Sequence, residues 1–103
     1  MEFHQITLEH IIPQNPKEDS NWLLDFDALF RKNYTYKLGN MTLLTNEKNA
    51  GAKNYDWQKK REKYKNTNLL MTAIIAEQAR ITKEYLDKRQ NEIVEILSIA
   101  LDL

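Results

Sequence analysis

Two short stretches of the chain carry the apolar and β-branched pattern of β-strands. Residues 6–14 (ITLEHIIPQ) are rich in β-branched side chains and meet Pro13, which predicts a short strand running into a loop. Residues 41–45 (MTLLT) form the clearest strand of the sequence, because Gly39-Asn40 supplies turn chemistry directly before it. The pattern therefore predicts two short strands, each bounded by turn or helix-capping residues.

Helical spacing of apolar residues accounts for much of the remaining chain. It predicts helical segments over residues 22–30, 46–50, 55–65, 67–79 and about 81–101. The last of these carries an apolar face that is either core or a docking surface for other parts of a parent protein. The predicted fold class is α+β, with two short antiparallel strands and a short helix surrounded by several longer α-helices. Residues 1–103 are expected to form one domain, with its core at about 6–54 and a helical extension at about 55–103.

Composition narrows the class of protein further. Hydrophobic residues make up 42% of the chain and charged residues 29%, which is ordinary for a globular domain. The chain has no cysteine, which excludes a disulfide scaffold and a thiolate zinc site. No apolar run is long enough to span a bilayer, and no signal peptide is present, so we expect a cytoplasmic protein without a membrane partner.

Charge is unevenly distributed although the net charge is zero. Residues 1–30 and 66–103 are net acidic, whereas residues 31–65 carry ten basic and three acidic side chains. A local basic stretch beside an acidic one is compatible with a site that binds phosphate and holds a metal ion. A solvated face on a charged helix is the alternative reading of the same run.

Glu9, His10 and Asn49 supply the atom types that phosphodiester hydrolysis needs. A neutral imidazole can deprotonate the attacking water, because its ordinary pKa of about 6.5 lies near working pH. A divalent cation can stabilise the developing oxyanion and the leaving oxygen. Hard cations prefer oxygen ligands, which the carboxylate and the amide provide. Adjacent strand residues face opposite ways, so Glu9 and His10 could serve different sides of one phosphate.

These segments resemble a known nuclease family. LEHIIPQN, followed by LGNMTLLTNEKNAGAKN and WQKKREKY, is similar to HNH, or ββα-metal, nucleases. The resemblance is closest to the C-terminal HNH domain of GmrSD-type, modification-dependent (type IV) restriction enzymes, and it is firmest over residues 6–65. That family pairs a ParB-like nucleotide-hydrolysing domain with the HNH domain, so the chain is expected to be a C-terminal fragment of a larger prokaryotic protein.

The resemblance implies a role for each matching residue. Glu9 and Asn49 take the positions of the metal ligands, and His10 takes that of the general base. Asn40 matches the central asparagine, whose amide pins the loop and helps to orient the histidine. A further histidine of some relatives is replaced here by Lys53, which cannot bind a metal ion while protonated. Two protein ligands fit one Mg²⁺ or Mn²⁺ bound mainly by water and phosphate, and not tight zinc.

Residues of the basic stretch are candidates for contacts with the backbone of double-stranded DNA. They are Lys53, Asn54, Lys59, Lys60 and Arg61. Trp22, Trp57 and the tyrosines are expected to pack in the core rather than to stack on bases.

The predicted function is a metal-dependent DNA endonuclease, within a phage-defence or modification-dependent restriction enzyme. One alternative is an HNH-like DNA-binding module that has lost catalysis. Another is a helical interaction domain whose motif match is accidental.

Overall fold

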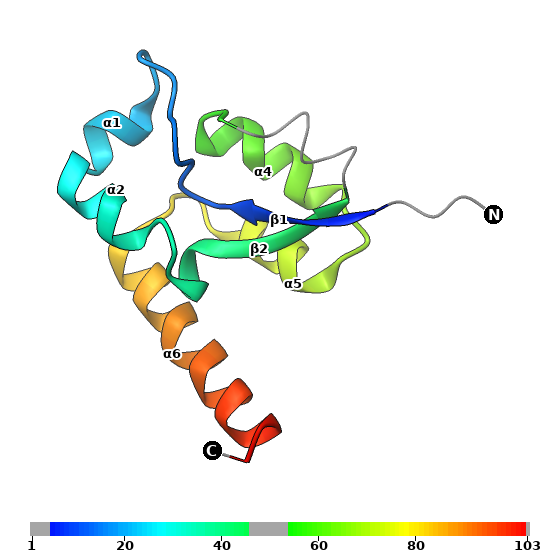
Figure 1. The fold of residues 1–103 in the computed structure, drawn as a ribbon. Coiled ribbons are helices and arrows are strands. Elements are labelled where there is room, and N and C mark those ends of the chain that lie inside the picture. Colours follow the sequence, from blue (N-terminus) through cyan, green and yellow to red (C-terminus); the bar gives the residue numbers. More distant parts are fainter. Residues whose placement is uncertain (1–4, 46–53, 103) are drawn as a thin grey trace.

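The computed structural model describes residues 5–45 and 54–102, and its architecture is α+β, as predicted (Figure 1). In chain order the elements are β1 (Ile6–His10), α1 (Asn21–Asp25), α2 (Ala28–Tyr34), the 3-10 turn η1 (Leu38–Asn40), β2 (Met41–Thr45), α4 (Trp57–Lys65), α5 (Leu70–Ala73), the 3-10 turn η2 (Ile74–Glu77) and α6 (Lys83–Ala100). Both predicted strands are present. The short helix expected at 46–50 lies outside the described residues.

The two strands form an antiparallel ribbon with a fixed register. His10 pairs with Met41, and Glu9 pairs with Thr42. Because side chains alternate across a strand, Glu9 faces the interior while Leu8, on the other face, is exposed. A polar side chain is thus buried on the core face of β1.

One helix expected over residues 22–30 is in fact two. Helix α1 ends at Asp25, Phe26 is extended, and Asp27 begins α2 by accepting a hydrogen bond from the backbone N–H of Phe30. An aspartate that binds the backbone in this way favours a new N-cap over a continuous helix. Helix α2 then extends to Tyr34, beyond the end of the segment expected to be helical. Stacked rings of Phe26, Phe30 and Tyr34 bridge the break.

The helix expected over residues 67–79 is also shorter, because it consists of α5 followed by η2. Thr72 of α5 is buried, and its hydroxyl lies 2.7 Å from that of Thr42 on β2. Arg61 of α4 donates to the Ala76 carbonyl at 2.7 Å. These tertiary contacts override the local helical preference.

Buried apolar side chains from both halves of the chain form one core. They are Ile11, Ile12, Trp22, Phe26, Tyr34, Leu44, Trp57, Tyr64, Ile75, Ala76, Ile81 and Leu86. The segment that directly follows His10 therefore sits at the centre of the molecule, where its backbone is held by packing.

Helix α6 packs tightly on the turn η1. Any Cβ at Gly39 would lie 2.3 Å from the Leu86 carbonyl oxygen, so the contact requires glycine. Gln90 accepts a hydrogen bond from the Gly39 N–H at 2.7 Å, and the buried Arg89 donates to the carbonyls of Gly39 and Met41 at 2.6 and 3.1 Å. The first half of α6 thereby fixes the turn that leads into β2.

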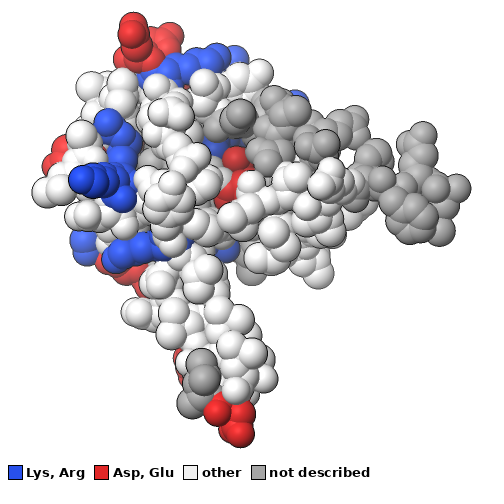
Figure 2. Space-filling view, viewed as in Figure 1, with Lys and Arg blue, Asp and Glu red and all other residues white. Residues whose placement is uncertain are grey.

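The second half of α6 projects from the body of the molecule (Figure 1). The predicted apolar face does not enter the core there, since Ile96 is 64% and Ile99 75% exposed. On the face that Figure 2 shows, the projecting half is mostly uncharged, with acidic side chains at its tip. None of the helices in residues 5–45 and 54–102 is long and apolar enough to cross a membrane.

We expect Gly39→Ala to lower the free energy of unfolding by about 2–3 kcal/mol, because the added methyl must push two backbones apart. Chemical denaturation measures the change. Asn91→Ala, an exposed substitution on the same helix, serves as the control and should change stability by less than about 0.5 kcal/mol. Equal stability of the two variants would contradict the tight contact.

Candidate active site

Glu9 is the buried acid of the predicted site. Its side chain is 2% exposed and lies among α4 residues. Tyr64 donates its hydroxyl to Oε2 of Glu9 at 3.0 Å, and the Lys60 ammonium lies 3.4 Å from the same oxygen. Burial raises the pKa of Glu9, while the charge of Lys60 and both hydrogen bonds act to lower it. No other described residue binds the carboxylate, so its second oxygen, Oε1, is left for a further partner.

His10, the predicted base, ends β1 on the opposite face of the strand. Its Nε2 is buried and has no hydrogen-bond partner among the described residues. The nearby backbone of Thr35 acts to raise the pKa of the ring. Burial, with the nearby Lys60 charge, lowers the pKa of His10 below 6.5. The lowered pKa favours the neutral imidazole at neutral pH, the form in which one ring nitrogen has a free lone pair.

Asn40 joins the turn η1 to the segment after His10. Its side-chain carbonyl accepts from the Ile12 N–H at 2.8 Å, and its amide donates to the Ile12 carbonyl at 3.2 Å. Its backbone carbonyl accepts from the Ile11 N–H at 2.8 Å. Asn40 is 1% exposed, so these bonds satisfy groups that would otherwise be buried without partners. The amide thus holds the chain two residues after the histidine, and its effect on the orientation of His10 stays a prediction.

Lys60 lies in a different place from the surface contact that the sequence suggested. The residue is 0% exposed, and besides Glu9 its ammonium donates to the His10 carbonyl at 2.6 Å. Burial lowers its pKa from 10.5 to about 8, so it remains mainly charged at neutral pH. Buried within the fold, this ammonium is not available to a DNA phosphate; it bridges the two residues of the predicted site instead.

The other predicted residues, one metal ligand and four DNA contacts, fall into three groups. Asn49 and Lys53 lie outside the described residues. Arg61 is tied to the Ala76 carbonyl, which restricts its head group. Lys59 is exposed, with its ammonium 5.0 Å from the centre of the Tyr55 ring, and Asn54 is half-buried. On the face that Figure 2 shows, Lys and Arg side chains also gather over α2, which the sequence reading had not singled out.

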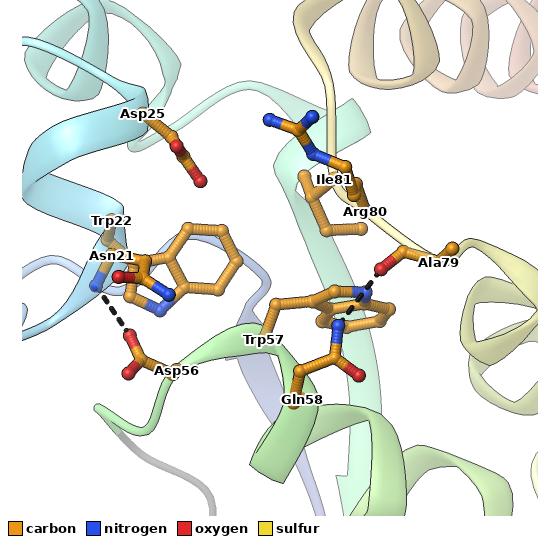
Figure 3. Close-up of a pocket in the computed structure, with 9 residues that line it drawn as sticks. All are labelled: Asn21, Trp22, Asp25, Asp56, Trp57, Gln58, Ala79, Arg80 and Ile81. Atoms are coloured by element: carbon orange, nitrogen blue, oxygen red, sulfur yellow. Dashed lines mark hydrogen bonds between the residues drawn. The ribbon is translucent and has the colours of Figure 1, made fainter.

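A small pocket of about 130 Å³ lies away from these residues, between α1, the start of α4 and residues 79–81 (Figure 3). Trp22 and Trp57 form part of its wall. Both are buried, and their indole N–H groups donate to the carbonyls of Tyr55 and Gln78. The tryptophans are thus packing residues, as predicted, and none of the predicted site residues lines this pocket.

Comparison with protein families identifies the chain. Residues 1–96 match the family model described as GmrSD restriction endonucleases, C-terminal domain. The chain belongs to this family. No curated protein and no solved structure matches it. Membership indicates a nuclease domain of the restriction-endonuclease type. Such a domain belongs to a larger parent protein and acts on DNA.

The donor set of this GmrSD C-terminal domain suits a hard divalent ion. Residues 5–45 and 54–102 contain no cluster of three or more His, Cys, Asp or Glu that could hold a metal ion unaided. What they do provide is one carboxylate with Oε1 unused and one buried, unpartnered imidazole nitrogen. A single protein carboxylate completed by an amide, water and phosphate is a usual environment for Mg²⁺. The described residues therefore fit such an ion, but only as a partial shell.

Sequence reasoning missed Lys60 and Tyr64 as members of the site. Both belong to the buried face of α4 with Trp57, at the spacing i, i+3 and i+7 of one helical stripe. The signal was present, because a lysine in phase with two aromatic residues points inward with them. When the charges of residues 59–65 are counted as one basic run, the fact that Lys60 shares a helical face with Trp57 and Tyr64 is overlooked.

We expect Lys60→Met to lower the free energy of unfolding by about 3–5 kcal/mol, because Glu9 would stay buried without its counter-charge. The pKa of Glu9 is already raised, so ionised Glu9 destabilises the fold, and the loss should grow as pH rises through its folded pKa. Urea denaturation at acid and neutral pH measures this. The double variant Lys60→Met with Glu9→Gln is the control and should recover part of the loss; no recovery would mean that the ion pair is not the cause.

Proposed function

We propose that this domain is a metal-dependent endonuclease that hydrolyses double-stranded DNA, with His10 as the general base. The observation that carries the proposal is the imidazole nitrogen Nε2, which is buried and has no partner in residues 5–45 and 54–102. A buried polar atom without a hydrogen bond is rare in a folded protein, and a catalytic role is one of the reasons for which such an atom is kept. Here it is the atom that would accept a proton from water.

The surroundings of His10 support the same role. The backbone of Thr35 lies close enough to the ring to influence its pKa, and a proton held on Nδ1 would leave Nε2 to act as the base. Asn40 holds the backbone of the next two residues, so the ring sits on a segment with little freedom. A general base gains most when it is neutral and already aimed before the substrate arrives.

Glu9 and Asn49 are the proposed protein ligands of one Mg²⁺ or Mn²⁺. When bound, such an ion supplies Lewis-acid stabilisation of the charge that develops on the phosphate. Glu9 offers Oε1, the oxygen to which none of the described residues is bonded. Asn49 has its role from the family resemblance alone. Because Lys60 already balances the charge of Glu9, the ion should be held weakly until DNA adds negative phosphate oxygens.

Basic and polar residues around the site would hold the DNA backbone. The proposed contacts are Lys53, Asn54, Lys59 and Arg61. Such contacts bind the backbone without reading sequence and weaken with salt. The parent protein is proposed to be a cytoplasmic, modification-dependent restriction enzyme of phage defence with a ParB-like nucleotide-hydrolysing domain. This last step rests on family resemblance.

The inactive DNA-binding alternative has one observation in its favour. The Glu9 carboxylate is already paired with the Lys60 ammonium, so a metal ion would have to share this carboxylate with Lys60. An inactive domain would bind DNA and would not cut it in Mg²⁺ or Mn²⁺.

We expect His10→Ala to reduce plasmid nicking in Mn²⁺ by about 10²-fold or more, the usual contribution of a general base. The assay compares wild type and variant at equal protein and metal concentration. His4→Ala, which removes the only other histidine of the chain, is the control and should cut like wild type. Equal cutting by His10→Ala and wild type would reject His10 as the base, and no cutting by either would favour the inactive alternative.

The pH dependence of cleavage should show the neutral histidine directly. The base works only when deprotonated, so kcat/KM at saturating metal should fall as pH decreases, with a midpoint below 6.5 because the pKa of His10 is lowered. Activity should be full from neutral pH upward until other groups titrate. A rate that is constant down to pH 5, or one that rises on acidification, would exclude this role.

A further inference from the structure

Two buried donors on α4 touch neither the water nor the DNA in the mechanism above. They are Lys60 and Tyr64, and both direct their polar heads at the same oxygen, Oε2 of Glu9. Both are fully buried. A lysine is almost never completely buried unless it is paired, and a tyrosine in such a place normally has a specific hydrogen-bond acceptor. The arrangement therefore calls for a reason beyond packing.

These donors come from a rigid element. Residues 60 and 64 are one helical turn apart on α4, so their side chains reach the same place. The helix is itself fixed against η2 and the segment after it: the Trp57 indole donates to the Gln78 carbonyl at 3.0 Å, and Arg61 donates to Ala76. The indole of Trp57 also packs edge-on against the Tyr64 ring, with 5.5 Å between centroids. Tyr64 consequently has little freedom to move its hydroxyl.

Two bonds to one oxygen determine how a carboxylate is presented. Oε2 is occupied by the Tyr64 hydroxyl and the Lys60 ammonium, and the Lys60 ammonium also binds the His10 carbonyl. The rotation of the carboxylate is thereby restricted, and Oε1 is the oxygen left over. A carboxylate constrained in this way can give a metal ion one oxygen in a fixed direction.

We propose that Tyr64 and Lys60 are positioning residues, which hold Glu9 through Oε2 so that Oε1 alone is presented to the metal ion. This inference rests on the proposed function, because it assumes that Glu9 is a metal ligand. It assigns to two buried residues of the helical extension a direct effect on metal affinity. A variant of Tyr64 gives a clearer test than a variant of Lys60, since removing the tyrosine hydroxyl changes no charge at neutral pH.

The experiment measures Mn²⁺ affinity of the domain without DNA, from the loss of the electron paramagnetic resonance signal of free Mn²⁺. Tyr64→Phe should weaken binding by about fivefold to twentyfold, because one of the two bonds that orient the carboxylate is lost. In nicking assays the same variant should need more Mn²⁺ for half-maximal rate, while the rate at saturating Mn²⁺ stays near that of wild type.

The chain offers a matched control. Tyr34 is also buried, and its hydroxyl also donates to a carboxylate, that of Asp87 on α6. Tyr34→Phe makes the same chemical change away from Glu9 and should leave Mn²⁺ affinity unchanged. A merely structural role for Tyr64 predicts that both variants shift the melting temperature and that neither shifts the affinity.

The variant Glu9→Gln separates the ligand role of Glu9 from the positioning role of Tyr64. If Glu9→Gln loses Mn²⁺ binding while Tyr64→Phe binds like wild type, the positioning role is wrong and the proposed ligand stands. If Glu9→Gln binds Mn²⁺ like wild type, Glu9 is not a ligand, and both ideas fail.

A second measurement uses the unchanged protein, so it does not depend on the variants folding. In wild-type crystals containing Mn²⁺, the anomalous signal should place the ion on Oε1, with Oε2 still bonded to Tyr64 and Lys60. An ion on Oε2, or one bound by both oxygens after Lys60 has moved away, would overturn the proposal.

Discussion

The ion pair between Lys60 and Glu9 is the interaction on which the site depends. Taking two charges out of water is costly, and their attraction offsets this only when the geometry is good and the remaining donors and acceptors are satisfied. Lys60 meets this condition with the Glu9 carboxylate and the His10 carbonyl, and Oε2 of Glu9 accepts from Tyr64 as well, whereas Oε1 has no partner among the described residues. One lysine on α4 thereby links both predicted site residues of β1 to the helical half of the domain.

The opposite side of the site is held by backbone contacts instead of charge pairing. Helix α6 lies against Gly39, where only a glycine fits, and Arg89 binds the carbonyls on both sides of Asn40. Asn40 in turn satisfies the N–H and C=O of Ile12. The residues that follow His10 are thus fixed by a chain of buried hydrogen bonds that begins in the last helix. The helical extension thus holds the candidate site, and the family match over residues 1–96 includes most of this extension.

Much of the fold could be predicted from sequence, since β-branched runs and helical spacing report local preference directly. Both strands and α6 followed from these signals. The break at Asp27 did not, because an aspartate in an apolar stretch can cap a new helix or face solvent, and only the neighbouring rings decide which. The short α5 likewise depends on the contacts of Thr72 with β2, which have no local signature.

The site was less predictable than the fold. The motif predicted roles for Glu9 and His10 that stay predictions, whereas the hydrogen bonds of Asn40 to Ile12 are visible in the structure. Lys60 was assigned to the surface, because a run of cations obscures which member faces inward. The place of Asn49 stays a prediction, since residues 46–53 are not described.

A crystal structure of the domain with Mn²⁺ and a short DNA duplex tests the central claim most directly. We expect one ion bound by Glu9 and Asn49 at roughly 2.0–2.3 Å, with a water at about 2.6–3.2 Å from Nε2 of His10 and facing the scissile phosphorus. An ion bound to Nε2 itself, or an Asn49 side chain far from the ion, would contradict the account.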